Sequence, residues 1–258
     1  MPKADWVEVT STAGKVLVHY PNRTADAYDS SLANGLRTAW TTLVAPHYTN
    51  ITNLVIKPIQ SWRSVSFAEA DATEIESKRQ VHVVLFKLHD DHGLNRYLEF
   101  VNDSKAAYER AWGAYRRDEF GWDKLVAMGN YDRFTVTPAA LAGTWSSTDF
   151  ASVSYYYASS GRAAGTSATS SANEYVFDAK SGYTSDHASA SGPVGQAKFS
   201  RQQYAGKYAI EGGTKLTLTN RFGGKSEVFT VYFRAVKNGS ILVLIDSRNS
   251  VTYLGKRT

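Results

Sequence analysis

The segment LAGTWSSTDF, residues 141–150, marks a change of architecture in the middle of the chain. Gly143-Thr144-Trp145 stands at the head of a stretch that then alternates like a β-strand. The preceding TPAALA (137–142) has the composition of a turn and a short helical link. A fresh start at this point predicts two domains, residues 1–137 and residues 138–258.

The chain after Trp145 loses helical periodicity and predicts a series of short strands. These are VSYYY (153–157), EYVFD (174–178), GYTSDHASASG (182–192), GKYAI (206–210), KLTLTNRF (215–222), SEVFTVYFRAV (226–236), SILVLI (240–245) and SVTYLG (250–255). Turn signals separate them, and Asn238-Gly239 is a favoured pair for a tight hairpin. About eight such strands indicate an all-β, up-and-down barrel, because closure removes exposed sheet edges. The small, polar residues 158–172 predict a loop over the barrel mouth.

The first half of the chain contains both helical and strand-like patterns, which predict an α+β domain with helices on an antiparallel sheet. Two short strands are expected in 6–20 around the turn at 12–14, and others at 53–59, 62–72, 78–88 and 95–101. Residues 25–48 predict a helix with Asp29 or Ser30 as N-cap and an apolar face that includes Leu36 and Leu43. A second helix is expected in 103–115.

Composition and charge limit the possible functions. The chain contains no cysteine, which excludes disulfides and thiol catalysis. Residues 140–258 carry 13 Lys+Arg against 7 Asp+Glu, a net charge of +6, whereas residues 1–139 have a net charge of −1. The basic residues are scattered, so we expect no nucleic-acid partner. The longest apolar runs are too short for a membrane span. MPKADWVEV lacks the apolar stretch of a signal peptide, so the start is either natural or added after a leader was trimmed.

Gly143-Thr144-Trp145 at the head of the first barrel strand resembles the Gly-x-Trp signature of the lipocalins. In that family the tryptophan closes one end of the barrel, and a basic residue from a late strand packs across its ring. The resemblance covers residues 140–258 and implies that Gly143 and Trp145 close this barrel. The candidates for the basic residue are Arg248, Lys256 and Arg257. Other lipocalin signatures are not evident, so the expected domain is lipocalin-like.

The whole chain also resembles a group of bacterial exported proteins that have no assigned activity. These proteins join an α+β domain to a lipocalin-like domain through a segment similar to MGNYDRFTVTPAALAGTW (128–145). The resemblance implies a periplasmic or secreted location and supplies no activity.

Alternation on the predicted strand 226–236 divides its side chains between two faces. One face holds Tyr232 and Arg234, and the other holds Phe229, Val231 and Phe233. If the first face lines the barrel, Tyr232 and Arg234 lie side by side and bind a ligand carboxylate by charge-assisted hydrogen bonds. This arrangement would be similar to the head-group site of fatty-acid-binding barrels. In the alternative, the second face forms the core and Arg234 points to solvent.

His187 is the only histidine of the second half. Tyr183, Ser185 and Ser189 share its strand face, and hydroxyl groups around one histidine are typical of a cavity wall with a general acid or base. His187 is therefore the candidate catalytic residue and a candidate ligand-binding residue, with a surface histidine as the alternative. The tyrosines expected to line the same space are Tyr155, Tyr157, Tyr175, Tyr204 and Tyr208.

His89-Asp90-Asp91-His92 contains four potential metal ligands, but it lies between two predicted strands and is followed by Gly93. Aspartate and glycine are typical of turns, so this segment predicts a hairpin turn. No zinc-protease, calcium-loop, phosphate-loop or dinucleotide motif occurs. We therefore expect no metal site and no cofactor.

Three functions remain open at this point. The first is an extracytoplasmic binding protein whose barrel holds a small apolar or amphipathic ligand, with an anionic group favoured by the charge of +6. The second is a barrel enzyme of isomerase, hydratase or hydrolase type that uses His187. The third is a protein- or glycan-interaction module with a filled barrel. The sequence favours binding over catalysis and leaves a protein partner undetermined.

Overall fold

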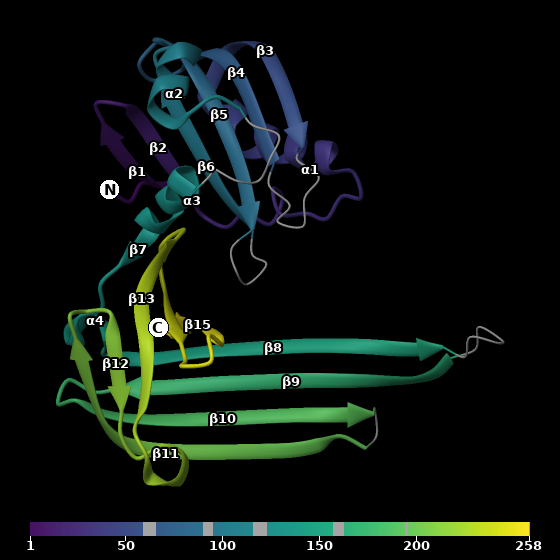
Figure 1. Ribbon diagram of the computed structural model, residues 1–258. Coiled ribbons are helices and arrows are strands. Elements are labelled where there is room, and N and C mark those ends of the chain that lie inside the picture. The colour runs from purple at the N-terminus through teal and green to yellow at the C-terminus, as the bar shows by residue number, and fades with distance from the viewer. Residues whose placement is uncertain (59–65, 90–94, 116–122, 157–162, 194–195, 258) are drawn as a thin grey trace. The chain divides into compact units, whose positions relative to one another are not determined.

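The computed structural model describes residues 1–58, 66–89, 95–115, 123–156, 163–193 and 196–257 (Figure 1). These residues form two compact units. Unit 1 contains Met1–Arg133 and Ala235–Gly239, and unit 2 contains Phe134–Arg234 and Ser240–Thr258. None of the described helices is long and apolar enough to cross a membrane.

Unit 1 contains a six-stranded antiparallel sheet with the order β1-β2-β6-β5-β4-β3. The strands are β1 (Trp6–Ser11), β2 (Gly14–His19), β3 (Tyr48–Pro58), β4 (Ser66–Glu74), β5 (Gln80–His89) and β6 (Asn95–Asn102). The helices are α1 (Leu32–Ala39), α2 (Lys105–Trp112) and α3 (Asp123–Met128), and a 3-10 turn, η3 (Gly129–Asp132), follows α3. This arrangement confirms the predicted α+β class.

Both faces of this sheet are buried, because alternate side chains of β5 enter different cores. Val84 and Phe86 belong to a cluster that includes Tyr108 of α2 and Leu125 of α3. Leu85 belongs to a second cluster, together with apolar residues of α1 and of the turns that follow it. The strand pattern of period two therefore produces a sheet covered by helices on two sides.

The first helix differs from the prediction at its N-terminus. Its N-cap is Ser31, whose hydroxyl accepts a hydrogen bond from the backbone N–H of Asn34. Asp29 instead accepts a hydrogen bond from the backbone N–H of Ser31, which holds the capping residue in place. After Ala39 the helix widens into a π-helical turn, η1 (Trp40–Val44), and ends in a 3-10 turn, η2 (Ala45–His47), that contains Pro46.

A carboxylate lies in the core of unit 1 beneath α1. Glu99 is fully buried, accepts a hydrogen bond from the Tyr48 hydroxyl at 2.5 Å, and lies 2.8 Å from His19 Nε2. The edge of the Trp6 ring meets His19, with the ring centroids 5.7 Å apart. Burial and the neighbouring carboxylate raise the pKa of Tyr48, so this hydroxyl keeps its proton and acts as donor.

Unit 2 is a closed, eight-stranded antiparallel barrel, as predicted. Its strands are β8 (Gly143–Tyr156), β9 (Ala163–Phe177), β10 (Gly182–Pro193), β11 (Lys198–Glu211), β12 (Lys215–Leu218), β13 (Glu227–Val236), β14 (Gly239–Ile245) and β15 (Val251–Lys256). The strands pair in the order β12-β11-β10-β9-β8-β15-β14-β13, and pairing of β12 with β13 closes the ring. The short β7 (Arg133–Phe134) extends the order beyond β13, and α4 (Pro138–Leu141) precedes β8.

The region predicted as a loop, 158–172, is in large part a strand, which corrects that expectation. Residues 163–172 form the first part of β9 and pair with β8, and from Ser167 onward they also pair with β10. Hydrophobicity did not mark this segment, because it consists of small and hydroxyl-bearing residues. Backbone pairing on both sides supplies the order that its side chains do not specify. Residues 157–162 lie outside the described residues.

Four strands continue past the barrel as a projecting sheet, which we call the blade (Figure 1). It consists of residues 148–156, 163–172, 188–193 and 198–203. Among the described residues, β8 pairs with β15 only at Trp145 and Ser146, and β12 pairs with β11 only from Tyr208 to Glu211. The blade therefore contains only β8, β9, β10 and β11 among the described strands, and its two outer strands lack a neighbour there.

Candidate ligand-binding site inside the barrel

Trp145 lies at one end of the barrel, near the start of β8. This side chain is buried, donates a hydrogen bond from Nε1 to the Leu141 carbonyl at 2.7 Å, and stacks on Phe233 with the ring centroids 5.4 Å apart. Lys256 Nζ lies 5.3 Å from the centroid of the Trp145 ring. Gly143 has a φ of +123° and lies close to the Lys256 side chain. A Cβ added at Gly143 would stand 3.1 Å from Lys256 Cε.

These contacts identify Lys256 as the basic residue that packs across the tryptophan. The other two candidates have different partners. Arg248 forms an ion pair with Asp246, and Arg257 forms one with Glu174 at 2.9 Å.

Side chains fill the interior next to this end of the barrel. The residues of this core cluster are Val136, Leu141, Trp145, Tyr175, Phe177, Tyr183, Tyr208, Leu216, Leu218, Phe229, Val231, Phe233, Leu242, Leu244 and Leu254. Two pockets lined by described residues of this unit, of about 390 and 360 Å³, lie mainly among the outward-facing side chains of β9, β10 and β11. The filled part of the interior ends on the side of the blade, beyond this aromatic core.

Arg221 lies at that limit of the filled core. It follows β12 and precedes a 3-10 turn, η4 (Phe222–Gly224), and its side chain is almost completely buried. Arg221 Nε donates to Glu227 Oε2 at 2.7 Å, and Nη1 donates to Ser185 Oγ at 2.7 Å. Nη1 also lies 3.1 Å from His187 Nε2. One guanidinium thus connects a carboxylate, a hydroxyl and an imidazole.

The neighbours of His187 determine its tautomer. Because a guanidinium only donates hydrogen bonds, His187 Nε2 is the acceptor in the contact with Arg221. The Nδ1 proton then faces Asn173 Oδ1, which lies 2.8 Å away. Burial and the charge of Arg221 lower the pKa of His187 to about 4. His187 is therefore an uncharged group at neutral pH, held in one orientation.

Aromatic rings surround the guanidinium. Its central carbon lies 4.5 Å from the ring centroid of Tyr204, 5.2 Å from that of Phe222 and 5.8 Å from that of Tyr175. Burial raises the pKa of Tyr175 to about 12, so its hydroxyl stays protonated. The site combines a fixed cation, neutral hydrogen-bonding groups and π-faces, which suits the recognition of an anion attached to an apolar or aromatic body.

Alternation places several of the predicted residues on the inner face. Tyr175 and Tyr208 belong to the core cluster, and His187 lies next to them, with its ring centroid 5.1 Å from that of Tyr175. The side chain of Tyr155 and all of Tyr157 lie outside the described residues. The segment His89-Asp90-Asp91-His92 also falls outside the described side chains.

Tyr232 and Arg234 lie away from this interior. Phe229, Val231 and Phe233 of β13 enter the core cluster, so the alternate side chains Tyr232 and Arg234 belong to the opposite face of the strand. The core face of this strand is therefore the one with the three apolar residues, as in the second of the two alternatives. Arg234 departs from that alternative in one respect, because it is buried, with its Nη2 3.4 Å from the Tyr232 hydroxyl. The predicted head-group pair is present but does not line the barrel.

Arg221 is the site residue that the sequence did not indicate. It was expected within a strand, KLTLTNRF, whereas β12 ends at Leu218 and Arg221 belongs to the following turn. The pair Gly223-Gly224 just after it was a signal for that turn. The inward direction of its side chain, however, depends on contacts with β10 and β13, which are distant in the sequence.

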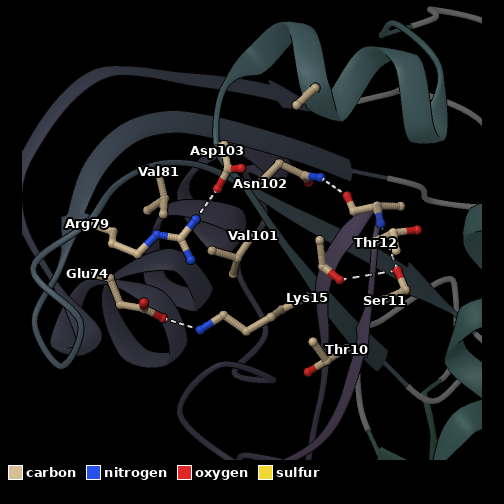
Figure 2. Close-up of a pocket in the computed structure, with 13 residues that line it drawn as sticks. Thr10, Ser11, Thr12, Lys15, Glu74, Arg79, Val81, Val101, Asn102 and Asp103 are labelled. Carbon is tan, nitrogen blue, oxygen red and sulfur yellow. Dashed lines mark hydrogen bonds and ion pairs between the residues drawn. The ribbon is translucent and has the colours of Figure 1, made fainter.

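Unit 1 has a polar pocket of about 260 Å³ at one end of its sheet (Figure 2). Lys15 Nζ lies 2.5 Å from Glu74 Oε1, and Arg79 forms an ion pair with Asp103. Both cations are thus compensated, and the residues that line this pocket include no aromatic ring. The barrel site offers more contacts to a ligand of mixed polarity.

No protein-family model and no curated protein sequence matches this chain. The class of protein therefore follows from the fold and the site alone: a barrel of lipocalin-like architecture with a cationic, aromatic-lined interior site.

The pKa of His187 predicts how the stability of unit 2 depends on pH. The unfolded chain has the ordinary histidine pKa of 6.5, and the folded pKa is about 4. Because the folded pKa is lower, acid favours the unfolded state. The contribution is intact above pH 6.5 and is lost as the pH falls through about 4, the pKa of the folded state.

We expect His187→Gln to flatten this dependence, as measured by chemical denaturation at a series of pH values. The useful quantity is the difference in unfolding free energy between the two proteins, because it removes the other titrating groups. A difference that does not change between pH 7 and pH 4 would contradict the assignment.

Proposed function

We propose that unit 2 binds a small molecule with an anionic head group and an apolar or aromatic body, and that Arg221 recognises the head group. The observation that carries the proposal is a guanidinium held inside the barrel at the boundary between its filled core and its polar inner wall. Glu227 occupies only the Nε side of this guanidinium. The partners at Nη1, Ser185 and His187, are both neutral.

A ligand anion would replace these neutral partners with an acceptor that is itself charged. Contacts of arginine with carboxylate or phosphate are frequently bidentate, which adds both energy and geometric specificity. The hydroxyl of Ser185 and the imidazole of His187 hold the guanidinium in position until a ligand oxygen replaces one of them. The ring of Phe222 is half exposed and packs on Tyr204 at 5.0 Å, which supplies an apolar contact next to the cation.

The inner wall beyond Arg221 is polar, which suits an approach from the blade side. The register places Gln202, His187 and Asn173 in one row across β11, β10 and β9, and Asn173 donates to Ser147 Oγ at 3.3 Å. The next row contains Ser200, Ser189 and Ser171. A polar head group meets hydroxyl and amide groups along this path before it reaches the guanidinium.

Catalysis by His187 is the second candidate function, and its electrostatics favour binding instead. A pKa of about 4 makes the imidazole a weak base at neutral pH, and its Nε2 already accepts a hydrogen bond. Proton transfer is most efficient when the pKa lies near the working pH. We therefore assign His187 a positioning role toward Arg221.

A periplasmic or secreted location belongs to this proposal and rests on the resemblance to exported proteins. Fractionation of the producing cells tests it, with a cytosolic enzyme as marker. Recovery of the protein with that marker would contradict the location without affecting the binding site.

The binding proposal predicts that the aromatic sulfonate 1-anilinonaphthalene-8-sulfonate binds to the folded protein and gains fluorescence. We expect Arg221→Gln to weaken its binding about tenfold or more, since a hydrogen bond to a charged group contributes about 1.5–3 kcal/mol. Arg257→Gln is the matched control, because it removes an exposed guanidinium of the same unit. Circular dichroism verifies that both variants are folded.

Two results would overturn this proposal. One is equal affinity of the probe for the wild type and Arg221→Gln, and the other is equal weakening by Arg257→Gln. Native mass spectrometry of freshly purified protein complements the titration, because a mass excess that is lost on denaturation identifies a natural occupant.

A further inference from the structure

The outer edge of β11 is covered near the barrel. Thr219 N donates to the Lys207 carbonyl at 2.9 Å, and Asn220 Nδ2 donates to the Ala205 carbonyl at 2.8 Å. These contacts show that the odd-numbered residues of β11 direct their backbone groups away from β10 and toward this edge. Thr219 and Asn220 thus cover the edge of β11 only as far as residue 205.

The same edge is open in the blade. Alternation directs the backbone N–H and C=O groups of Phe199, Arg201 and Gln203 to the edge as well. Among the described residues no strand lies beside them, because β12 pairs only with Tyr208–Glu211. An uncovered row of backbone donors and acceptors is a template for another strand.

None of the described side chains of the blade belongs to a core cluster. In β10, one of its two central strands, the side chains from Ala188 to Ser191 are small, and Ala188, Ser189 and Ser191 are exposed. Phe199 is 84% exposed, the highest value for a large hydrophobic side chain among the described residues of unit 2. Sheets of few strands gain stability when they acquire further strands or a covered face.

We propose that β11 of a second copy of this chain pairs antiparallel with this edge, related by a twofold axis at Ser200. This inference goes beyond the proposed ligand site and does not depend on it. Isologous pairing about a twofold axis is the commonest way in which identical chains associate. The side chains of the edge favour this register. Arg201 is compensated by Asp186, with Nε 3.0 Å from Oδ1.

The register with its centre at Ser200 places Phe199 of each copy opposite Arg201 of the other. A guanidinium on an aromatic ring is attractive, and cross-strand pairs of this kind stabilise sheets. The register with its centre at Arg201 instead brings two arginines directly opposite each other, which is unfavourable. Of these two registers, the one with its centre at Ser200 is therefore favoured.

The antiparallel pairing determines where the two barrels lie. The paired segments run antiparallel from the blade tips, so the two barrels lie at opposite ends of one continuous eight-stranded sheet. Residues 199 and 201 of each copy form two hydrogen-bonded pairs, and each pair exchanges two backbone hydrogen bonds. Ser200 faces its own counterpart as a non-hydrogen-bonded pair, where Cα atoms lie about 4.5 Å apart.

The absence of cysteine makes this register directly testable. A Ser200→Cys variant has its only thiols opposite each other across the axis, within the Cα separation of about 4.4–6.8 Å that a disulfide requires. We expect a disulfide-linked dimer after mild oxidation of the full-length variant. Ser189→Cys is the matched control, because Ser189 is also exposed, lies on the same face and pairs with Ser200 inside one chain. It should remain largely monomeric.

A second variant tests the pairing without a cross-link. Phe199→Pro removes an edge N–H that has no intramolecular partner among the described residues, so the fold tolerates it. In sedimentation velocity we expect a concentration-dependent dimer for the wild type and at least a tenfold higher dissociation constant for Phe199→Pro. A wild type that stays monomeric at all concentrations overturns the proposal. So does a dimer unaffected by Phe199→Pro, or equal cross-linking of the two cysteine variants.

Discussion

Trp145→Ala is expected to destabilise unit 2 by about 3–5 kcal/mol, the usual cost of removing a large buried aromatic side chain. Trp145 is 1% exposed, stacks on Phe233 and donates a hydrogen bond to Leu141. Its loss also leaves the Lys256 ammonium without the ring on which it lies. The barrel end would then contain a cavity lined by apolar groups.

Hydrogen exchange resolved by peptide mass spectrometry is the appropriate measurement for Trp145→Ala, because the chain has two units. Protection should fall in β13 and β14 and stay unchanged in β5 and β6. Val228→Ala is the control, since Val228 is 43% exposed and such substitutions usually change stability by less than about 0.5 kcal/mol. Unaltered protection of β13 in Trp145→Ala would show that this tryptophan does not close the barrel.

Glu99→Ala is expected to have the corresponding effect in unit 1, a loss of about 3 kcal/mol or more. The substitution leaves the Tyr48 hydroxyl and the His19 ring nitrogen without their acceptor in the core. Each orphaned buried polar group costs about 1–3 kcal/mol. Tyr48→Phe removes one of these hydrogen bonds with almost no change of shape and should cost less.

Chemical denaturation of the two variants, combined with exchange protection of β2 and β6, separates these effects. The expected order of stability is wild type, then Tyr48→Phe, then Glu99→Ala. If Glu99→Ala were as stable as the wild type, the buried carboxylate would be a dispensable feature of the core. The barrel peptides serve as the internal reference in both variants.

The parts of the fold that follow from local rules could be predicted. The hairpin at Asn238-Gly239 joins β13 to β14, and Asn238 has the positive φ of 63° that this turn requires. Most barrel strands follow from alternation and turn residues. The first half of β9 could not be predicted, because its serine, threonine and alanine residues carry no hydrophobic signal and are ordered by their neighbours.

The candidate site likewise contains residues that local rules predict and residues that they do not. Tyr175 and His187 lie on the inner face of regular strands, where alternation alone predicts direction. Alternation could not select a face of β13, because Phe233 on one side and Arg234 on the other are both buried. Arg221 could not be predicted, because a turn has no period and the direction of its side chain is set by Ser185, His187 and Glu227.

The strands β9 and β10 carry aromatic residues in the barrel and small residues in the blade, and this difference has a consequence for folding kinetics. A slip of two residues in the blade would exchange Ala188 for Ala190 and Ser189 for Ser191 in β10, and one small residue for another in β9, so this part of the two strands distinguishes poorly between registers. The rows with Tyr175 and Tyr183 admit no such exchange, since each ring occupies a defined place in the core. We therefore expect the register of β9 and β10 to form first at the aromatic end, with pairing of the blade residues following from it. The large side chains of the barrel core thus determine which backbone hydrogen bonds form in the distant blade.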